Sequence, residues 1–313
     1  MTLETPALLD RILAGDLRAL ARAATAIENH TVVGRELISA LFPQTGRAIV
    51  IGITGAAGAG KSTLVDQMAA HMRQAGKTVG IVAVDPSSPF SRGAILGDRI
   101  RMQRHHADPG VFIRSMASRG KLGGVARGTL EMALLLDAAG RDYVIIETVG
   151  VGQDEVEIAR LADVTVVVLV PGMGDDVQAI KAGIMEVADV FAINKADLPG
   201  AERLEQEIRA MQSVAHDVGC SHAAPIQRVI STDAAGVADL LHVISQVYQA
   251  SNHKQRRIEA WSVRLRELLR DELLESLPAK AIEEHAHRVA EKIEDPYTAL
   301  AALTSLVKNS YGH

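Results

Sequence analysis

Cysteine, aromatic residues and long apolar runs are all scarce in this chain. Cys220 is the one cysteine among 313 residues, which excludes an internal disulfide and favours a reducing compartment. Aromatic side chains make up 3% of the sequence, so a core built from its 48% hydrophobic residues must be mainly aliphatic. The longest strongly apolar run, residues 164–170, is too short to span a bilayer. Residues 1–6 lack the basic and apolar stretches of a signal peptide, so we expect a cytoplasmic protein with no membrane partner.

Concentrated positive charge is absent as well. The sequence has 33 Lys and Arg against 38 Asp and Glu, which gives a formal net charge of −5. No basic block stands out, and nucleic-acid-binding proteins carry a basic patch or stripe. We therefore expect no nucleic-acid partner.

Short apolar segments alternate with helical periodicity from residue 49 to about residue 248. The predicted strands are 48–53, 79–84, 111–114, 143–147, 164–170, 189–193 and 226–230. This alternation predicts an α/β fold with a mostly parallel sheet and helices on both faces. Ligands of such sheets bind at the carboxyl ends of the strands.

Helical patterns flank this central region. Residues 6–43 carry apolar residues at three- and four-residue spacing, with a break and a new cap at Gly15-Asp16. We therefore divide the chain into an N-terminal helical extension (1–45), a central domain (46–250) and a C-terminal helical arm (251–313).

The C-terminal arm carries an apolar stripe that needs a surface to cover it. The stripe consists of Ile258, Trp261, Leu265, Leu268, Leu269 and Leu273. Pro278 ends this helix, and a second one is predicted from Asp295-Pro296 through Val307. The stripe packs either on its own domain or on a second subunit, and the pattern alone leaves both open.

A complete G-x-x-x-x-G-K-[ST] motif lies at residues 55–62, directly after the first predicted strand and before a helical pattern. In that context, consecutive backbone N–H groups surround a polyphosphate and the helix start adds its positive dipole end. We expect Lys61 to reach the β- and γ-phosphates and the Ser62 hydroxyl to ligate Mg²⁺. The predicted phosphate-loop residues are Gly55, Gly58, Ala59, Gly60, Lys61, Ser62 and Thr63. The motif predicts a nucleoside triphosphate site.

The base of that nucleotide is predicted from Asn194-Lys195-Ala196-Asp197, which ends another apolar strand. The carboxylate of Asp197 can accept hydrogen bonds from guanine N1–H and the 2-amino group, a donor pair that adenine lacks. A buried acceptor left unpaired by the wrong base costs several kcal/mol. The Lys195 stem can cover the base plane. Ser231 and Thr232 form a second candidate loop on the guanine side, so the expected ligands are GTP and GDP with Mg²⁺.

Acidic residues follow two of the predicted strands. Glu147 ends one strand and can hold Mg²⁺ through water or polarise the attacking water, and the Gly150 N–H can bond the γ-phosphate. Asp85 ends another strand and is a candidate metal residue behind Glu147. In the Gly-, Ser- and Arg-rich segment that follows, Asp98 can reach metal and Arg101 can reach phosphate.

Several longer sequence segments around these motifs resemble those of a known family. They are V-D-P-S-S-P-F-S at 84–91, G-A-I-L-G-D-R at 93–99, S-R-G-K-L-G-G at 118–124, E-T-V-G-V-G-Q at 147–153 and P-G-M-G-D-D-V-Q-A-I-K-A-G at 171–183. With the N-K-x-D box, they resemble the methylmalonyl-CoA mutase-associated GTPases of the MeaB/ArgK type, which are metallochaperone-like P-loop GTPases. The resemblance covers essentially the whole chain. Ala56, Ala57 and Ala59 stand where many members carry Pro or Val, a departure that leaves the loop chemistry intact.

This resemblance implies a homodimer whose C-terminal helices form the dimerisation arm. It implies an adenosylcobalamin-dependent acyl-CoA mutase as partner, for which the GTPase gates cofactor delivery and removal of damaged cofactor. It also marks a third switch loop in which Asp175 and Lys181 carry signalling and catalytic charges; taken alone, Asp175, Asp176 and Lys181 are typical of a solvated loop and helix start.

We hypothesise that GTP hydrolysis is slow in the isolated protein and faster on the mutase, where Lys181 or Arg101 neutralises transition-state charge. One alternative is a nickel-insertion GTPase, although the adjacent pair His105-His106 cannot face one metal from a helix. The other is a kinase linked to periplasmic amino-acid transport, for which no phosphoacceptor site is apparent.

Overall fold

The computed structural model describes residues 5–86, 102–105, 107–118, 124–148, 161–172, 187–217, 223–278 and 280–310. The chain forms two compact units, Met1–His253 and Lys254–His313. The first unit contains the sheet, and the described part of the second consists of helices and the turns between them.

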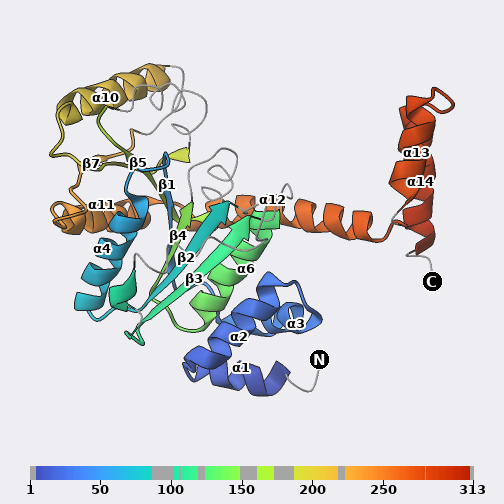
Figure 1. The fold of residues 1–313 in the computed structure, drawn as a ribbon, viewed down its shortest axis with the longest axis horizontal. Coiled ribbons are helices and arrows are strands. Elements are labelled where there is room, and N and C mark those ends of the chain that lie inside the picture. The colour runs from blue at the N-terminus through green and yellow to red at the C-terminus, as the bar shows by residue number, and fades with distance from the viewer. Residues whose placement is uncertain are drawn as a thin grey trace. The chain divides into compact units, whose positions relative to one another are not determined.

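A seven-stranded sheet organises the first unit (Figure 1). Its strands are β1 (Ile49–Thr54), β2 (Val79–Pro86), β3 (Val111–Ser118), β4 (Tyr143–Thr148), β5 (Val164–Leu169), β6 (Val190–Ile193) and β7 (Ile226–Arg228). Their order is β3-β2-β4-β1-β5-β6-β7, and every adjacent pair is parallel. The predicted α/β class and all seven predicted strands are confirmed. β3 extends four residues beyond its predicted end, and β7 stops two residues short.

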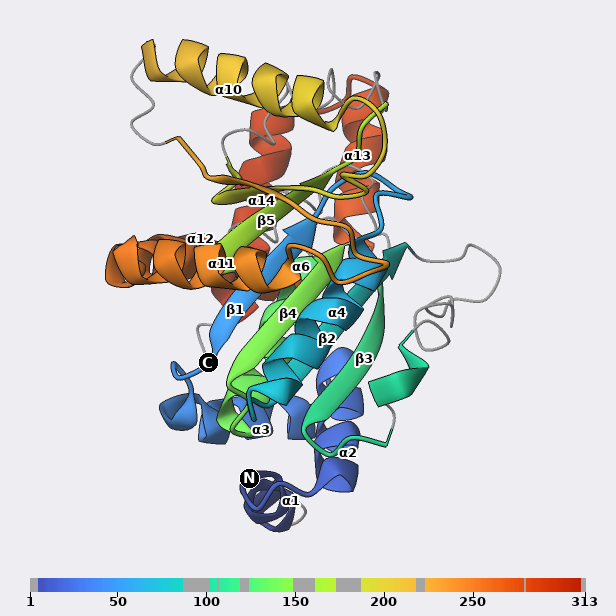
Figure 2. The same cartoon turned by 90° about the vertical axis from the view of Figure 1, so that its left-hand side faces the viewer.

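Two layers of helices cover the sheet (Figure 2). On one face lie α4 (Lys61–Gln74) and α11 (Val237–Ala250). The other face packs against α6 (Gly124–Ala138) and the helices α1 (Thr5–Leu13), α2 (Leu17–Glu28) and α3 (Val32–Leu41). α10 (Ala201–Asp217) covers β5 and β6, and the short 3₁₀ turns η1 (Phe42–Gln44) and η2 (Gln103–His105) join elements.

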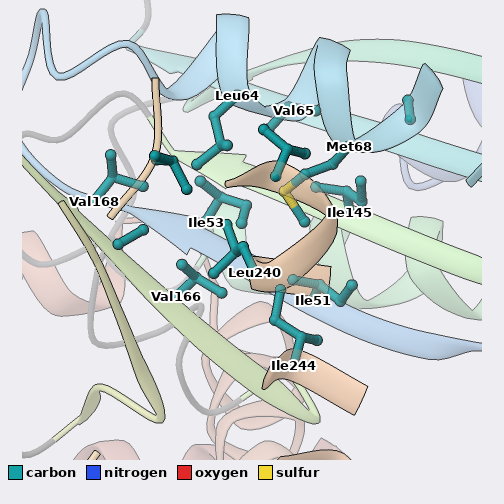
Figure 3. Close-up of a cluster of buried hydrophobic side chains, with 14 of the residues drawn as sticks. Ile51, Ile53, Leu64, Val65, Met68, Ile145, Val166, Val168, Leu240 and Ile244 are labelled. Atoms are coloured by element: carbon teal, nitrogen blue, oxygen red, sulfur yellow. The ribbon is translucent and has the colours of Figure 1, made fainter. Parts of the chain in front are cut away.

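The core between the sheet and α4 is aliphatic, as the low aromatic content predicts. Figure 3 shows Leu64, Val65 and Met68 of α4 meeting side chains of the sheet and of α11. Their partners are Ile51, Ile53, Ile145, Val166, Val168, Leu240 and Ile244. Alternate residues of β1 to β6 enter this cluster, and the residues between them face the helices on the other side of the sheet.

The N-terminal helices pack into the first unit. The break predicted at Gly15-Asp16 is confirmed: Asp16 caps α2 by accepting hydrogen bonds from the N–H groups of Arg18 (2.8 Å) and Ala19 (3.1 Å). Gly34 lets α3 approach α2, because a Cβ there would lie 2.6 Å from the carbonyl oxygen of Ala26.

Three aspartates connect neighbouring strands at the amino-terminal edge of the sheet. Asp142, Asp163 and Asp189 each stand directly before a strand and accept a hydrogen bond from a backbone N–H of the neighbouring strand's start. The distances are 2.8 Å to Thr78, 2.9 Å to Val50 and 2.8 Å to Thr165. Each carboxylate therefore satisfies a backbone donor and ties two adjacent strands together.

The second unit contains α12 (His253–Glu275), α13 (Ala281–Ala290) and α14 (Pro296–Ser310). Asp295 caps α14 as the Asp-Pro pair predicts, by accepting from the N–H groups of Tyr297 (2.9 Å) and Thr298 (3.1 Å). α13 was not predicted from the sequence. No helix among the described residues is long and apolar enough to cross a membrane.

The contact between Arg73 and Asp108 generates a stability prediction. Arg73 at the end of α4 donates two hydrogen bonds to Asp108, at 2.8 and 3.0 Å. This guanidinium holds the pKa of Asp108 below its ordinary value; burial opposes the shift and the Gly110 N–H supports it. Because the folded-state pKa is the lower one, the stabilisation is present above the unfolded pKa of about 4 and is lost as pH falls through the folded value.

We therefore expect Asp108→Asn to lower the free energy of unfolding by about 1–2 kcal/mol at pH 7. This deficit should begin to close as the pH falls below about 4 and should vanish below the lowered folded-state pKa, where the wild-type carboxylate is protonated as well. Denaturant unfolding at several pH values measures it, with Asp10→Asn, an exposed acid on α1, as control. A deficit that stayed constant down to pH 3 would contradict the assignment.

Candidate nucleotide-binding site

The phosphate loop joins the end of β1 to the start of α4, at the carboxyl edge of the sheet. Its backbone requires glycine at three positions, because Gly55, Gly58 and Gly60 have φ of +136°, +79° and +83°. A Cβ on Gly55 would also lie 2.1 Å from the carbonyl oxygen of Val168 on β5. The motif therefore adopts the compact turn in which backbone N–H groups can converge on phosphate oxygens.

Lys61 is buried at the first position of α4, and its ammonium lies against its own loop. Nζ donates to the carbonyl oxygens of Gly55 (2.6 Å) and Ala56 (2.8 Å). The side chain is thereby folded over the loop, and its charge stands beside the backbone that would cradle a phosphate. Thr63, two residues further on, is exposed.

Ser62 and Glu147 bring two oxygen ligands together from different elements. The Ser62 hydroxyl on α4 donates to Oε1 of Glu147 on β4 at 2.7 Å, and Glu147 is buried. Hard oxygen ligands of this kind, few in number and next to a phosphate loop, suit Mg²⁺, which keeps waters and takes its other ligands from substrate phosphates. The residues present therefore fit the metal.

The N-K-x-D box is hydrogen-bonded directly to the phosphate loop. Asn194 follows β6 and is buried; its Nδ2 donates to the carbonyl oxygen of Ala59 at 2.8 Å. Its Oδ1 accepts from the Ser231 hydroxyl at 2.8 Å and from the Ser231 N–H at 3.2 Å. One side chain thus links the phosphate loop, the end of β6 and the loop after β7.

Lys195 strengthens the same link. It has a φ of +54°, and its Nζ donates to the carbonyl oxygen of Gly58 at 3.0 Å, so its stem crosses from the base side to the phosphate side. Asp197 and Thr232 are exposed, which leaves the carboxylate and the hydroxyl accessible to a ligand. The structure therefore brings together the predicted phosphate loop, Glu147, Asn194, Lys195 and Ser231.

Several predicted site residues lie outside the described residues. They are Asp98, Arg101, Gly150, Asp175, Asp176 and Lys181. Asp85 lies on β2 in register with Ala117, but its side chain is also outside the described part. Their roles stay predictions.

Two threonines at this edge were not predicted as part of the site. Thr54 ends β1 and Thr148 ends β4, and the Thr148 hydroxyl donates to the Thr54 hydroxyl at 3.1 Å. The sequence does carry a signal for them, since each is a hydroxyl residue at the last position of a strand that is otherwise mainly aliphatic.

A multi-residue metal store is not found in the part of the chain that the structure describes. There, no group of three or more His, Cys, Asp or Glu side chains is placed to hold a metal ion. His105 instead packs beside the carboxylate of Asp66, with Nε2 and Oδ1 3.1 Å apart.

The fold and the site together define a P-loop GTPase: a parallel sheet, a glycine-dependent phosphate loop and an N-K-x-D box joined to it. Within that class, the sequence model described as "Methylmalonyl Co-A mutase-associated GTPase MeaB" matches residues 20–282. The chain belongs to this family, which confirms the resemblance seen in its motifs.

Individual relatives agree with this family. A protein from Pyrococcus abyssi named as a GTPase is 44% identical over 302 residues, which cover 93% of each chain. GTPase ArgK of Escherichia coli is 34% identical over 317 residues, which cover 96% of each. A solved structure described as an LAO/AO transport system kinase superposes with a TM-score of 0.71 at 27% identity, covering 98% of this chain and 99% of that one.

The contact between Gly60 and Asn194 generates a prediction. A Cβ on Gly60 would lie 2.4 Å from Nδ2 of Asn194, so Gly60→Ala must displace the amide that joins the two halves of the site. We expect it to weaken GDP binding by at least about tenfold, the effect of losing one or two buried hydrogen bonds. Titration with a fluorescent GDP analogue measures this loss.

Gly76→Ala is the matched control. Gly76 has a similar φ of +75°, but a Cβ there would meet nothing within 4 Å. Both substitutions place a Cβ on a residue with positive φ, so Gly76→Ala should lower thermal stability without weakening GDP binding. Equal losses of affinity in the two variants would show that strain, rather than displacement of Asn194, is responsible.

Proposed function

We propose that this GTPase is a chaperone for an adenosylcobalamin-dependent acyl-CoA mutase, coupling GTP binding and hydrolysis to delivery, protection and reactivation of the cobalamin cofactor. The family description, which names an association with methylmalonyl-CoA mutase, supports this proposal. A further relative, 36% identical over 205 residues, is a Caenorhabditis briggsae protein named methylmalonic aciduria type A homolog, mitochondrial. The match covers 61% of this chain and 50% of that protein.

The single observation that carries the nucleotide part of the proposal is the bond from Asn194 to Ala59. It holds the base box at a fixed position relative to the phosphate loop, so a guanine on Asp197 and a triphosphate on the loop belong to one ligand. GTP therefore satisfies both halves of the site together.

In the proposed mechanism, Lys61 moves from the carbonyl oxygens of Gly55 and Ala56 to the phosphates, where its charge offsets the negative charge that develops during transfer. Ser62 would ligate Mg²⁺ and Glu147 would accept from a water of its shell, and the bound ion would neutralise phosphate charge. The Gly150 N–H would donate a hydrogen bond to the γ-phosphate and would lose it when that phosphate leaves. Lys181 or Arg101 would supply further positive charge on the mutase.

A second candidate function has one specific observation in its favour. The similar solved structure is described as an LAO/AO transport system kinase, so a phosphotransferase linked to amino-acid transport is the alternative. Incubation with γ-labelled GTP and ATP separates the two, since a kinase leaves a stably labelled protein whereas a GTPase releases labelled phosphate. Nickel insertion is the third possibility, raised by the histidines of the sequence, and nickel titration of the purified protein tests it.

The proposed mutase partner should change the rate of GTP hydrolysis. We expect GTP turnover to rise at least about tenfold when a purified adenosylcobalamin-dependent acyl-CoA mutase is added, a change of about 1.4 kcal/mol in the barrier. Phosphate release measures this rate, with ATP as the nucleotide control and an unrelated acyl-CoA enzyme as the protein control. Equal turnover with and without every such mutase would contradict the chaperone proposal and leave the GTPase assignment intact.

We also propose that the second unit mediates homodimerisation. α12 exposes the apolar stripe predicted from the sequence: Leu265 and Leu269 are each 60% exposed and Ile258 is 53% exposed. Such a row at helical spacing is typical of an interface seam, and a second copy supplies a matching one.

The double substitution Leu265→Asp and Leu269→Asp should therefore convert a dimer to a monomer, because it buries two carboxylates in the seam. Sedimentation equilibrium measures the mass. Arg270→Asp, which places a new carboxylate at an exposed position of α12 off the stripe, should leave the dimer intact. A wild-type protein that is monomeric at all concentrations would refute the proposal.

A further inference from the structure

Thr54 and Thr148 form a buried hydroxyl pair directly beside the two elements that hold the nucleotide. Thr54 is the residue before Gly55, and Thr148 is the residue after Glu147. The Thr148 hydroxyl donates to Oγ1 of Thr54 at 3.1 Å, and the two residues are 1% and 0% exposed. The pair therefore connects the entry of the phosphate loop to the strand end that carries the acidic site residue.

This bond lies one residue beyond the backbone pairing of β1 with β4. That pairing runs as far as Ile53 opposite Glu147. At the next level, Thr54 is in register with Val167 of β5, and Thr148 is in register with Val84 of β2. Among the described residues, the link between β1 and β4 at this level is the hydroxyl–hydroxyl bond. It joins the strands at the point where β1 leaves the sheet for the phosphate loop.

The surroundings of the pair make the bond matter energetically. The register neighbours Val167 and Val84 are 0% and 2% exposed, so both hydroxyls lie among apolar side chains. A hydroxyl left without its partner there costs the desolvation of that group, because water does not replace the bond. The two strand ends are therefore held together rather than merely adjacent.

The threonine pair and Glu147 lie on opposite faces of the sheet. Successive side chains of a strand alternate between faces, so Glu147 and Ile53 project toward α4, and Thr148 and Thr54 project the other way. On the α4 side, Glu147 accepts from Ser62 at 2.7 Å. Glu147 is therefore held on the α4 side of the sheet by its bond with Ser62. On the other side, the bond of its neighbour Thr148 holds the strand end that carries it.

We propose that the Thr54–Thr148 hydrogen bond is a positioning contact that keeps the Glu147 carboxylate at Ser62, and so sets how tightly magnesium and nucleotide are held together. Neither threonine touches the ligand; both act through Glu147. The proposal rests on the GTPase class of the chain and not on the identity of its client, so none of its tests uses the mutase.

The test distinguishes the effect of removing a hydroxyl from the effect of changing side-chain volume. Thr148→Val and Thr54→Val each remove one hydroxyl at nearly constant volume, and the double variant removes both and leaves an apolar pair. Thr148→Ser keeps the hydroxyl. The matched control is Thr165→Val on β5, since Thr165 is fully buried and its hydroxyl has no hydrogen-bond partner among the described residues.

Two quantities are measured for each variant: the midpoint of thermal unfolding without nucleotide, and the dissociation rate of a fluorescent GDP analogue across a magnesium titration. Thr148→Val should raise the magnesium concentration that half-maximally slows dissociation by about fivefold, the effect of one lost hydrogen bond. In EDTA its dissociation rate should match wild type. Thr148→Ser and Thr165→Val should keep the wild-type magnesium dependence.

The double variant decides between positioning and mere stabilisation. Replacing both partners by apolar groups of the same shape is nearly neutral for stability, so its unfolding midpoint should return close to wild type. Under the proposal, its magnesium dependence stays shifted by about fivefold, because nothing then holds the strand end. A double variant that recovers both the midpoint and the magnesium dependence would overturn the proposal and leave the pair a structural contact only.

Discussion

The side-chain amide of Asn194 is the contact on which the geometry of the nucleotide site depends. It satisfies the carbonyl oxygen of Ala59 and receives two hydrogen bonds from Ser231, while it is itself buried. Three loops that are far apart in the sequence are thereby held at one place. Because a buried amide with unsatisfied groups is costly, displacement of any one of these loops disturbs the other two.

That arrangement explains why the glycines of the phosphate loop cannot be replaced freely. Gly55 leaves space for the carbonyl oxygen of Val168, and Gly60 leaves space for the amide of Asn194. The loop thus lies against backbone and side-chain atoms of the strands on one side of β1, whereas Glu147 and Thr148 lie on the other side. The site is built from both neighbours of the central strand, as ligand sites of parallel sheets generally are.

Much of the fold could be predicted from the sequence because its signals are local. Each strand is a short aliphatic run, and Asp16 and Asp295 mark helix starts by a chemistry that acts over three residues. The helix α13 was missed although Ile282, Ala286 and Val289 recur at helical spacing, because the position before it is Lys280, which makes no side-chain cap and gives no start signal. The end of β3 was placed at residue 114, four residues too early, because Ser115 interrupts the apolar run, although it stays in register with Ala83 of β2. Contacts between distant segments, such as Asn194 with Ala59 or Thr54 with Thr148, leave no pattern of spacing from which they could be derived.

The two edges of the sheet are secured by different means, and this has a consequence for how such a chain can change. At the amino edge, neighbouring strands are joined by bonds from backbone N–H groups to the carboxylates of Asp142, Asp163 and Asp189. These bonds involve no loop at the opposite edge. Strand alignment is therefore set at one end of the sheet and ligand chemistry at the other. Loops at the carboxyl edge that lie outside the Asn194 contacts can lengthen, shorten or exchange residues while the strands keep their alignment, so new partners can be acquired on a scaffold that does not need to be rebuilt.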